Sequence, residues 1–542
     1  MYRLQYLMPT GLLSAVLLFS SPNLYNAEID SEQYRLGKQL YAEGILPNGK
    51  QVKAVVQGDI AVQGDQLICA TCHRRSGMGT TEGQEVVPAI AGHILFNPLQ
   101  LPTSKPPAAP IYRPAYNRET LLRAVTQGID ANGEPMSPFM PRYAIDESTL
   151  DKLMSYLDTL SQSISPGVTD KEIHFATIIL DSNKPEDNQA MLDVLERYIE
   201  QKNVETRYES KRAEHAPWHK EWMFKPYRKW RLHTWRLNGA ESTWKEQLQA
   251  YMLEQPVFAV INGLVPVGWP GIHQFCENNA LPCLFPTTDT PELAEQSFYN
   301  LYLDRGVAQD AEALAAHLAG TSEVTQLYDP ADPLSTQAAE RFRAQMTETG
   351  RKVYDINLHD SGDVDALAEA QPPAQTLVVW SGREGVQALL QRLGRKSGEA
   401  PVVYLSSRFY GTQTDILPEA WRERIRFVHC QEMPDKLGHH LLRSTGWFKS
   451  KRIYNPQAKA IQANAYFALK ATGDALKQIR GYFYRDYFIE KIEHMVDDLP
   501  YTSVYPRVSM APGQRFASRG YYIARVDGKG GNLVRVSEWK AP

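Results

Sequence analysis

Two cysteines and a histidine form the run of residues with the most specific chemistry in this chain. Cys69 and Cys72 are separated by two residues, and His73 follows directly. On one helical turn this spacing lets both thiols add to the vinyl groups of a haem while the imidazole binds the iron. Half a zinc site is an alternative, but zinc needs four ligands and the next cysteine, Cys276, is far along the chain. A dithiol redox site is another, but the βαβ setting of such sites is not evident nearby. The run therefore predicts one covalently attached haem c.

A second axial ligand is expected in the segment 133–143, a loop with three prolines and two methionines. A thioether ligand favours ferrous iron and raises the haem potential. The Met-Pro pair at Met140 and its separation from His73 resemble class I c-type cytochromes, in which the distal methionine precedes a proline. That resemblance implies His73 and Met140 as the axial ligands, with Met136 as the alternative and Met78 as a packing or surface residue.

Three amphipathic helices are expected to position the haem. Apolar residues recur at helical spacing in 31–44 and 146–160, and a third helix starts at Asn117 and stops at Gly128. Three helices around one haem predict a small, all-α cytochrome c domain over residues 28–163.

The rest of the chain alternates between short apolar runs and amphipathic helices, after a linker at 161–168. The runs expected to be strands are 173–180, 257–261, 324–328, 377–380, 402–405 and 425–428, and a terminal hairpin is expected from 520–526 and 533–536. This alternation predicts parallel, doubly wound sheets with ligands outside the carboxyl ends of the strands. One sheet is too small for this length, so the expected fold class is multidomain, with a two-lobed α/β domain over 164–542 after the helical domain.

Three segments of this second part, 256–263, 271–282 and 285–291, carry a resemblance to type I periplasmic binding proteins. The relevant family supplies the substrate-binding components of branched-chain amino-acid ABC importers. There a strand ends in a small polar turn, a helix follows, and the next strand leads to a Ser/Thr-rich loop at the cleft between the lobes. The residues that the resemblance places in that cleft are Asn262, Gly263, Thr287, Thr288, Ser381, Ser406 and Ser407. These residues are equally typical of ordinary turns and helix caps.

Export is expected from the first residues of the chain. Arg3 precedes a short apolar core and a polar exit, so residues 1–27 read as a signal peptide and the mature protein as periplasmic, attached to a membrane only if the signal stays uncleaved. Cys276 and Cys283 are either a disulfide or two buried thiols, and Cys430 is expected to be a core thiol.

Charge narrows the possible partners. The 542 residues contain 58 Lys and Arg against 62 Asp and Glu, and this balance does not favour nucleic-acid binding. Residues 211–236 depart from it, with eight basic residues, two acidic residues and four tryptophans. This stretch is either a docking surface for an acidic redox partner, centred on Lys225, Arg228 and Lys229, or a strand edge followed by a solvated insertion.

No nucleophile elbow or catalytic metal-ligand pair is recognisable, so the chain is expected to be an electron carrier or binding protein rather than an enzyme. The main hypothesis is an exported haem c electron-transfer protein. Its binding-protein-like module would sense a small ligand or dock a periplasmic dehydrogenase or another cytochrome. The alternative is the substrate-binding component of an ABC importer with an accessory haem. A haem enzyme such as a peroxidase would need an open sixth position on the iron.

Overall fold

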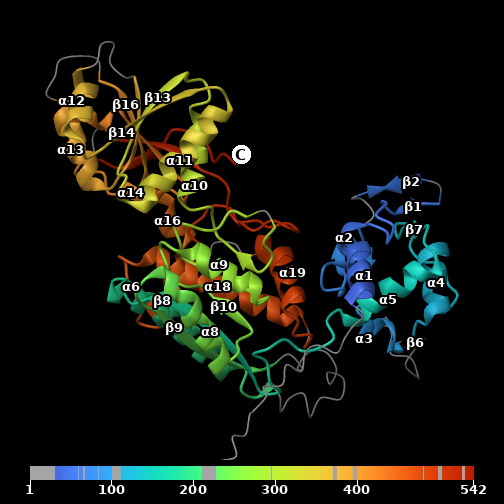
Figure 1. The fold of residues 1–542 in the computed structure, drawn as a ribbon. Coiled ribbons are helices and arrows are strands. Elements are labelled where there is room, and N and C mark those ends of the chain that lie inside the picture. Colours follow the sequence, from blue (N-terminus) through green and yellow to red (C-terminus); the bar gives the residue numbers. More distant parts are fainter. Residues whose placement is uncertain are drawn as a thin grey trace, which may run out of the picture. The chain divides into compact units, whose positions relative to one another are not determined.

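The computed structural model describes residues 31–58, 60–64, 68–82, 85–100, 112–209, 227–294, 296–369, 375–394, 400–479, 481–498, 503–527 and 531–541. The expected signal peptide lies outside these residues. The chain divides into two compact units, Met1–Gln162 and Ser163–Pro542 (Figure 1). In the described part of the chain, no helix has both the length and the apolar character that crossing a membrane requires.

The three expected helices of the first unit are α1 (Ser31–Glu43), α4 (Arg118–Gln127) and α5 (Glu147–Thr159), and two short helices, α2 (Cys69–His73) and α3 (Gly92–Leu95), join them. Asn117 caps α4 by accepting a hydrogen bond from the backbone of Thr120, and Gly128 ends it in the left-handed conformation. Helices α1 and α5 approach so closely at Gly37 that a Cβ there would lie 2.0 Å from the Lys152 carbonyl oxygen. Only glycine fits at this position.

The first unit is not purely helical, which corrects the expected all-α class. Strands β1 (Lys53–Val56), β2 (Ile60–Gln63) and β7 (Arg142–Tyr143) form an antiparallel sheet. Two further strand pairs are β3 (Thr80–Glu82) with β4 (Glu85–Val87), and β5 (Leu99–Gln100) with β6 (Tyr112–Arg113). Strands of two to four residues are too short to show a period-2 pattern, so they could not be predicted from the sequence.

The second unit begins with a five-stranded sheet in the order β12-β11-β10-β8-β9, whose neighbouring strands are all parallel. The strands are β8 (Glu172–Leu180), β9 (Lys229–Leu237), β10 (Ala259–Ile261), β11 (Cys283–Leu284) and β12 (Asn300–Leu301). The side chains of β8 are buried on both faces: Ile173, Phe175 and Ile179 belong to one core cluster, and Ala176 and Ile178 to another. This burial explains why β8 reads as a continuous apolar run.

Helices cover both faces of this sheet. On one face pack α6 (Pro185–Glu205), α17 (Leu442–Ser450), α18 (Lys459–Gln478) and α19 (Arg485–Met495), and on the other α8 (Trp244–Glu254) and α9 (Trp269–Asn278). Figure 1 shows α18, from late in the chain, beside the early strands β8 and β10. We call this sheet with its helices the first lobe.

The second lobe is built on a seven-stranded sheet in the order β14-β13-β15-β16-β17-β18-β19. Its strands are β13 (Glu323–Tyr328), β14 (Lys352–Asn357), β15 (Thr376–Trp380), β16 (Val402–Ser406), β17 (Ile425–His429), β18 (Tyr522–Val526) and β19 (Leu533–Arg535). The first five are parallel, and the expected terminal hairpin, β18 with β19, continues the sheet antiparallel to β17. The core on one face includes α10 (Val307–His317) and α11 (Pro333–Glu348), and that on the other α12 (Ser361–Glu369) and α13 (Arg383–Leu393). The expected two-lobed α/β arrangement is confirmed.

The basic, tryptophan-rich stretch is only partly described. Residues 210–226, including Lys225, lie outside the described ranges, and β9 forms the edge of the first lobe's sheet. Trp230 and Trp235 are buried core residues, so these two rings are not available to a docking partner. A docking role for the exposed Lys229 and for Arg228 stays a prediction.

The two cysteines left open by the sequence, Cys276 and Cys283, form a disulfide between the end of α9 and β11, with Cα atoms 6.4 Å apart. Replacing both by alanine should lower the free energy of unfolding by about 2–3 kcal/mol, because the bridge closes a short loop in the unfolded chain. Urea unfolding with and without reductant measures this effect. The free energy of unfolding of the double variant should not change with reductant, which provides the control. Equal free energies of unfolding for the variant and the non-reduced parent would contradict the expectation.

Candidate functional site

His73 is presented by α2 in a form suited to bind a metal. Its side chain is buried, and its Nδ1 lies 2.9 Å from the carbonyl oxygen of Pro88. A histidine that donates Nδ1–H to a carbonyl is held in one orientation with Nε2 left as the ligand atom, an arrangement shared by most metal-binding histidines. Burial lowers the pKa of His73 and so favours the neutral imidazole.

The two thiols beside it are not joined to each other. Cys72 is exposed, whereas Cys69 is less so and is hydrogen-bonded to the Tyr143 side chain. Burial raises the pKa of Cys69 to about 11, so this sulfur is a protonated thiol at neutral pH. Two thiols that are not in a disulfide, on one helical turn next to a histidine with an oriented ring, fit the attachment of a haem.

The methionine loop is held from one side by Arg142. Its guanidinium donates to the carbonyl oxygens of Met140, Met136 (3.4 Å) and Ser137 (3.3 Å). Met136 and Met140 are both half-buried, and Met78 is buried, in keeping with a packing role. The assignment of Met140 as the sixth iron ligand stays a prediction.

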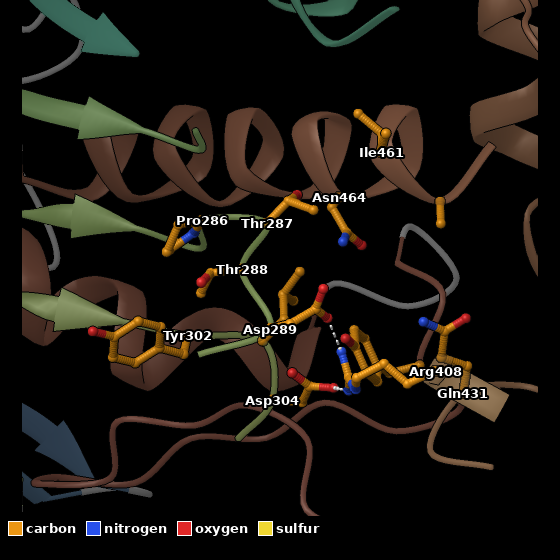
Figure 2. A pocket seen from close by; sticks show the side chains of 13 residues that line it. Pro286, Thr287, Thr288, Asp289, Tyr302, Asp304, Arg408, Gln431, Ile461 and Asn464 are labelled. Carbon is orange, nitrogen blue, oxygen red and sulfur yellow. Dashed lines mark hydrogen bonds and ion pairs between the residues drawn. The ribbon is translucent and has the colours of Figure 1, made fainter. Parts of the chain in front are cut away.

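A second candidate site is a cavity of about 100 Å³ between the two lobes of the second unit. It is lined by the loop Pro286–Asp289 after β11 and by Asp304 in the segment after β12. Arg408 of the second lobe and Asn464 of α18 also line it (Figure 2). The full set of lining residues is Pro286, Thr287, Thr288, Asp289, Tyr302, Leu303, Asp304, Arg408, Gln431, Ala460, Ile461, Asn464 and Tyr505.

Of the seven cleft residues expected from the sequence, the structure brings Thr287 and Thr288 to this cavity. Asn262 and Gly263 are not among its lining residues. Asn262 is fully buried with a φ of 54°, and its Nδ2 donates to the Phe285 carbonyl oxygen at 2.6 Å, so it holds neighbouring loops together. At Gly263 the φ is 140° and a Cβ would lie 3.1 Å from the Ile178 carbonyl oxygen, so this glycine permits close backbone packing.

The three serines of the second lobe are also outside the lining. The Ser406 hydroxyl donates to Asp310 at 2.5 Å, and its oxygen accepts from the Arg408 backbone N–H, capping α14 (Ser407–Tyr410). The Ser407 hydroxyl lies 2.8 Å from Nδ1 of His429. Ser381 is half-buried after β15. Ser406 and Ser407 therefore position their neighbours.

Arg408 ties the lobes together. Its guanidinium lies 2.7 Å from Asp289 and 2.5 Å from Asp304, and its Nε lies 3.5 Å from Asp310. Burial by itself would lower the pKa of Arg408, but Asp304, Asp310 and Asp289 together raise it well above the ordinary value. Tyr505 adds a side-chain hydrogen bond to Asp304. The guanidinium is therefore a permanent charge at this lobe junction.

Asp310 stands behind Arg408 and is itself almost fully buried. Burial raises its pKa, although Arg408 and the donors Ser406 and Cys430 (3.1 Å) act in the opposite direction. The Cys430 thiol is thus a core thiol, as expected, with a specific acceptor.

No family model and no curated protein matches this chain. Solved structures that resemble it include a leucine binding protein from Thermotoga maritima, with a TM-score of 0.45 and 16% identity over 68% of this chain and 99% of that one. A branched chain amino acid ABC transporter from Thermus thermophilus with bound valine has a TM-score of 0.48 and 12% identity over 69% and 98%. A fatty acid ABC transporter substrate-binding protein from Thermomonospora curvata has a TM-score of 0.46 and 16% identity over 70% and 95%.

Sequence reasoning missed the charged and amide residues of the cavity. Asp289 lies within the recognised loop, and Arg408 directly follows the recognised serines, so a search for charged residues just beyond each strand would have found both. Asn464 lies inside the long helix α18 and Tyr505 in an irregular segment. Nothing in their local sequence points to the cavity.

Proposed function

We propose that this chain is an exported small-molecule-binding protein whose first unit carries an accessory haem c. The observation that carries the binding function is a pair of polar atoms at the cavity between the lobes. Thr287 Oγ1 and Asn464 Oδ1 are inaccessible to solvent and have no hydrogen-bond partner among the described residues. A buried polar atom without a partner costs about 1–3 kcal/mol, and a ligand that supplies the partner recovers that free energy.

The partner of such a protein follows from the resemblance to importer binding proteins. The two-lobed unit would hand its ligand to a membrane transporter of the ABC type, and the periplasm is the compartment in which this happens. The disulfide between Cys276 and Cys283 supports an oxidising compartment.

Electron transfer is the second candidate, and the orientation of His73 by Pro88 favours it. A bound haem would supply one-electron redox chemistry. Cys69 and Cys72 would hold it covalently, and its iron would be bound by His73 through Nε2 and by Met140 or Met136. A periplasmic dehydrogenase or another cytochrome would be the redox partner.

A thermal-shift screen of the full chain against amino acids, fatty acids, amines and polyols tests the binding function. A ligand at one hundred times its Kd should stabilise the second unit by about 2.7 kcal/mol. The shift should disappear in Asn464→Leu, which removes the free amide from the cavity, and persist in Glu340→Gln on the exposed face of α11. If no compound in any class raises the melting temperature, the binding function is wrong.

A further inference from the structure

We propose that the cavity between the lobes selects a small organic cation with an ammonium group and rejects carboxylates. This inference rests on the proposed binding function and names its ligand class. It differs from what the resemblance to amino-acid importers implies, since every amino acid carries a carboxylate.

The charge of the cavity favours a cationic ligand. Among the described residues that line the cavity, Arg408 is the only cation, whereas Asp289 and Asp304 are both in the lining. Arg408 is already ion-paired with three carboxylates. Two of them, Asp289 and Asp304, line the cavity, and the third, Asp310, lies behind them. Even with Asp310 protonated, two carboxylates face one guanidinium. The described lining residues therefore carry a net negative charge, and none of them is an unpaired cation that could hold an acid.

The hydrogen-bond acceptors at the cavity favour a ligand with several N–H donors. Asn464 is 7% exposed, and Figure 2 shows its side chain pointing from α18 toward the loop that carries Thr287 and Asp289. Within the described ranges, the amide oxygen of Asn464 and the Thr287 hydroxyl oxygen have no hydrogen-bond partner. Asp289 gives one carboxylate oxygen to Arg408 and is a third exposed, so it retains acceptor capacity. An ammonium group has three N–H donors and no acceptor, and these are three acceptors.

Repulsion disfavours the opposite charge. A carboxylate placed next to one of these aspartates would be repelled by it, because both groups are negatively charged in a poorly solvated site. With Arg408 already paired, a bound acid would have to break an existing ion pair to find a cation. Rejection of acids thus follows from the same geometry that favours amines.

Size and wall chemistry limit the rest of the ligand. A cavity of 150 Å³ holds a benzene molecule, so about 100 Å³ leaves room for only a few carbon atoms. Pro286, Leu303, Ala460 and Ile461 provide an apolar wall for such a short chain. The expected ligand is a short alkyl amine or a similar small amphiphilic cation.

Isothermal titration calorimetry of the full chain tests the preference for an ammonium group. Three of the probes have the same shape: propylamine hydrochloride, sodium propionate and 1-propanol. L-valine is the fourth probe. Propylamine should bind at least about tenfold more tightly than propionate or valine. Asp289→Asn should weaken propylamine binding about tenfold while keeping the shape of the side chain. Thr287→Val is a second variant of the cavity and should also weaken binding, and the matched control Glu340→Gln should leave it unchanged.

The outcomes separate the two proposals. Tighter binding of propionate or valine overturns the amine assignment and leaves the binding function in place. Failure of propylamine to bind, or unchanged affinity in both Asp289→Asn and Thr287→Val, also overturns the assignment. The proposed binding function fails together with the amine assignment only if the thermal-shift screen finds no ligand of any class.

Discussion

Replacing Cys69 and Cys72 by alanine is expected to abolish covalent haem attachment completely. Each thiol can form one thioether bond to a haem vinyl group, so the double variant has no atom with which to make either bond. Mass spectrometry of denatured protein from a host that matures c-type cytochromes should show the apoprotein mass. The parent should carry the additional mass of one haem and a visible spectrum that survives denaturation.

The matched control is Cys430→Ser, because Cys430 is the remaining cysteine outside the disulfide and serine keeps a donor for Asp310. This variant should retain the haem. Within a haem-loaded parent, Met140→Ala should remove the sulfur-to-iron charge-transfer band, whereas Met136→Ala should keep it. An unmodified parent would contradict the haem assignment, and loss of the band only in Met136→Ala would reverse the ligand assignment.

Arg408→Met is expected to have the largest effect on stability, a loss of about 3–5 kcal/mol in the free energy of unfolding of the second unit. Methionine preserves most of the side-chain volume but leaves Asp304 and Asp310, which are 5% and 2% exposed, without their cation. Removing one partner of a buried ion pair costs far more than the pair contributes, because the remaining charge stays desolvated. The lobe junction would also lose the ion pair between Arg408 and Asp289.

All ten tryptophans lie in the second unit, so urea unfolding followed by tryptophan fluorescence reports on that unit alone. The Cys69→Ala, Cys72→Ala background prevents quenching by haem. Arg231→Met is the matched control: Arg231 pairs with Glu172 on the surface, where an ion pair contributes about 0–1 kcal/mol. Adding Asp304→Asn and Asp310→Asn to Arg408→Met should recover part of the loss. A loss below about 1 kcal/mol for Arg408→Met would show that the carboxylates are not held charged by this arginine.

Much of the architecture follows from local patterns. Continuous apolar runs such as 173–180 identify buried parallel strands, and the Asn117 cap with the Gly128 stop locates α4. The strands of the first unit were missed because pairs such as Arg142–Tyr143 are set by their partners across the sheet, and two residues contain no periodicity.

The chemistry of residues that are contiguous in the chain can be predicted without a structure. Cys69, Cys72 and His73 are neighbours in the chain, so their spacing is enough to predict the group they would hold. The second site could not be predicted in this way, because its residues come together from the loops after β11 and β12, from α14 and from α18. The partly buried Arg408 and the buried Asp304 are held in place by partners on the opposite lobe. The local sequence does not show such partners, because each residue is ordinary in its own segment. Whether a side chain gains an ion-pair partner or stays unpaired is decided only when the lobes pack.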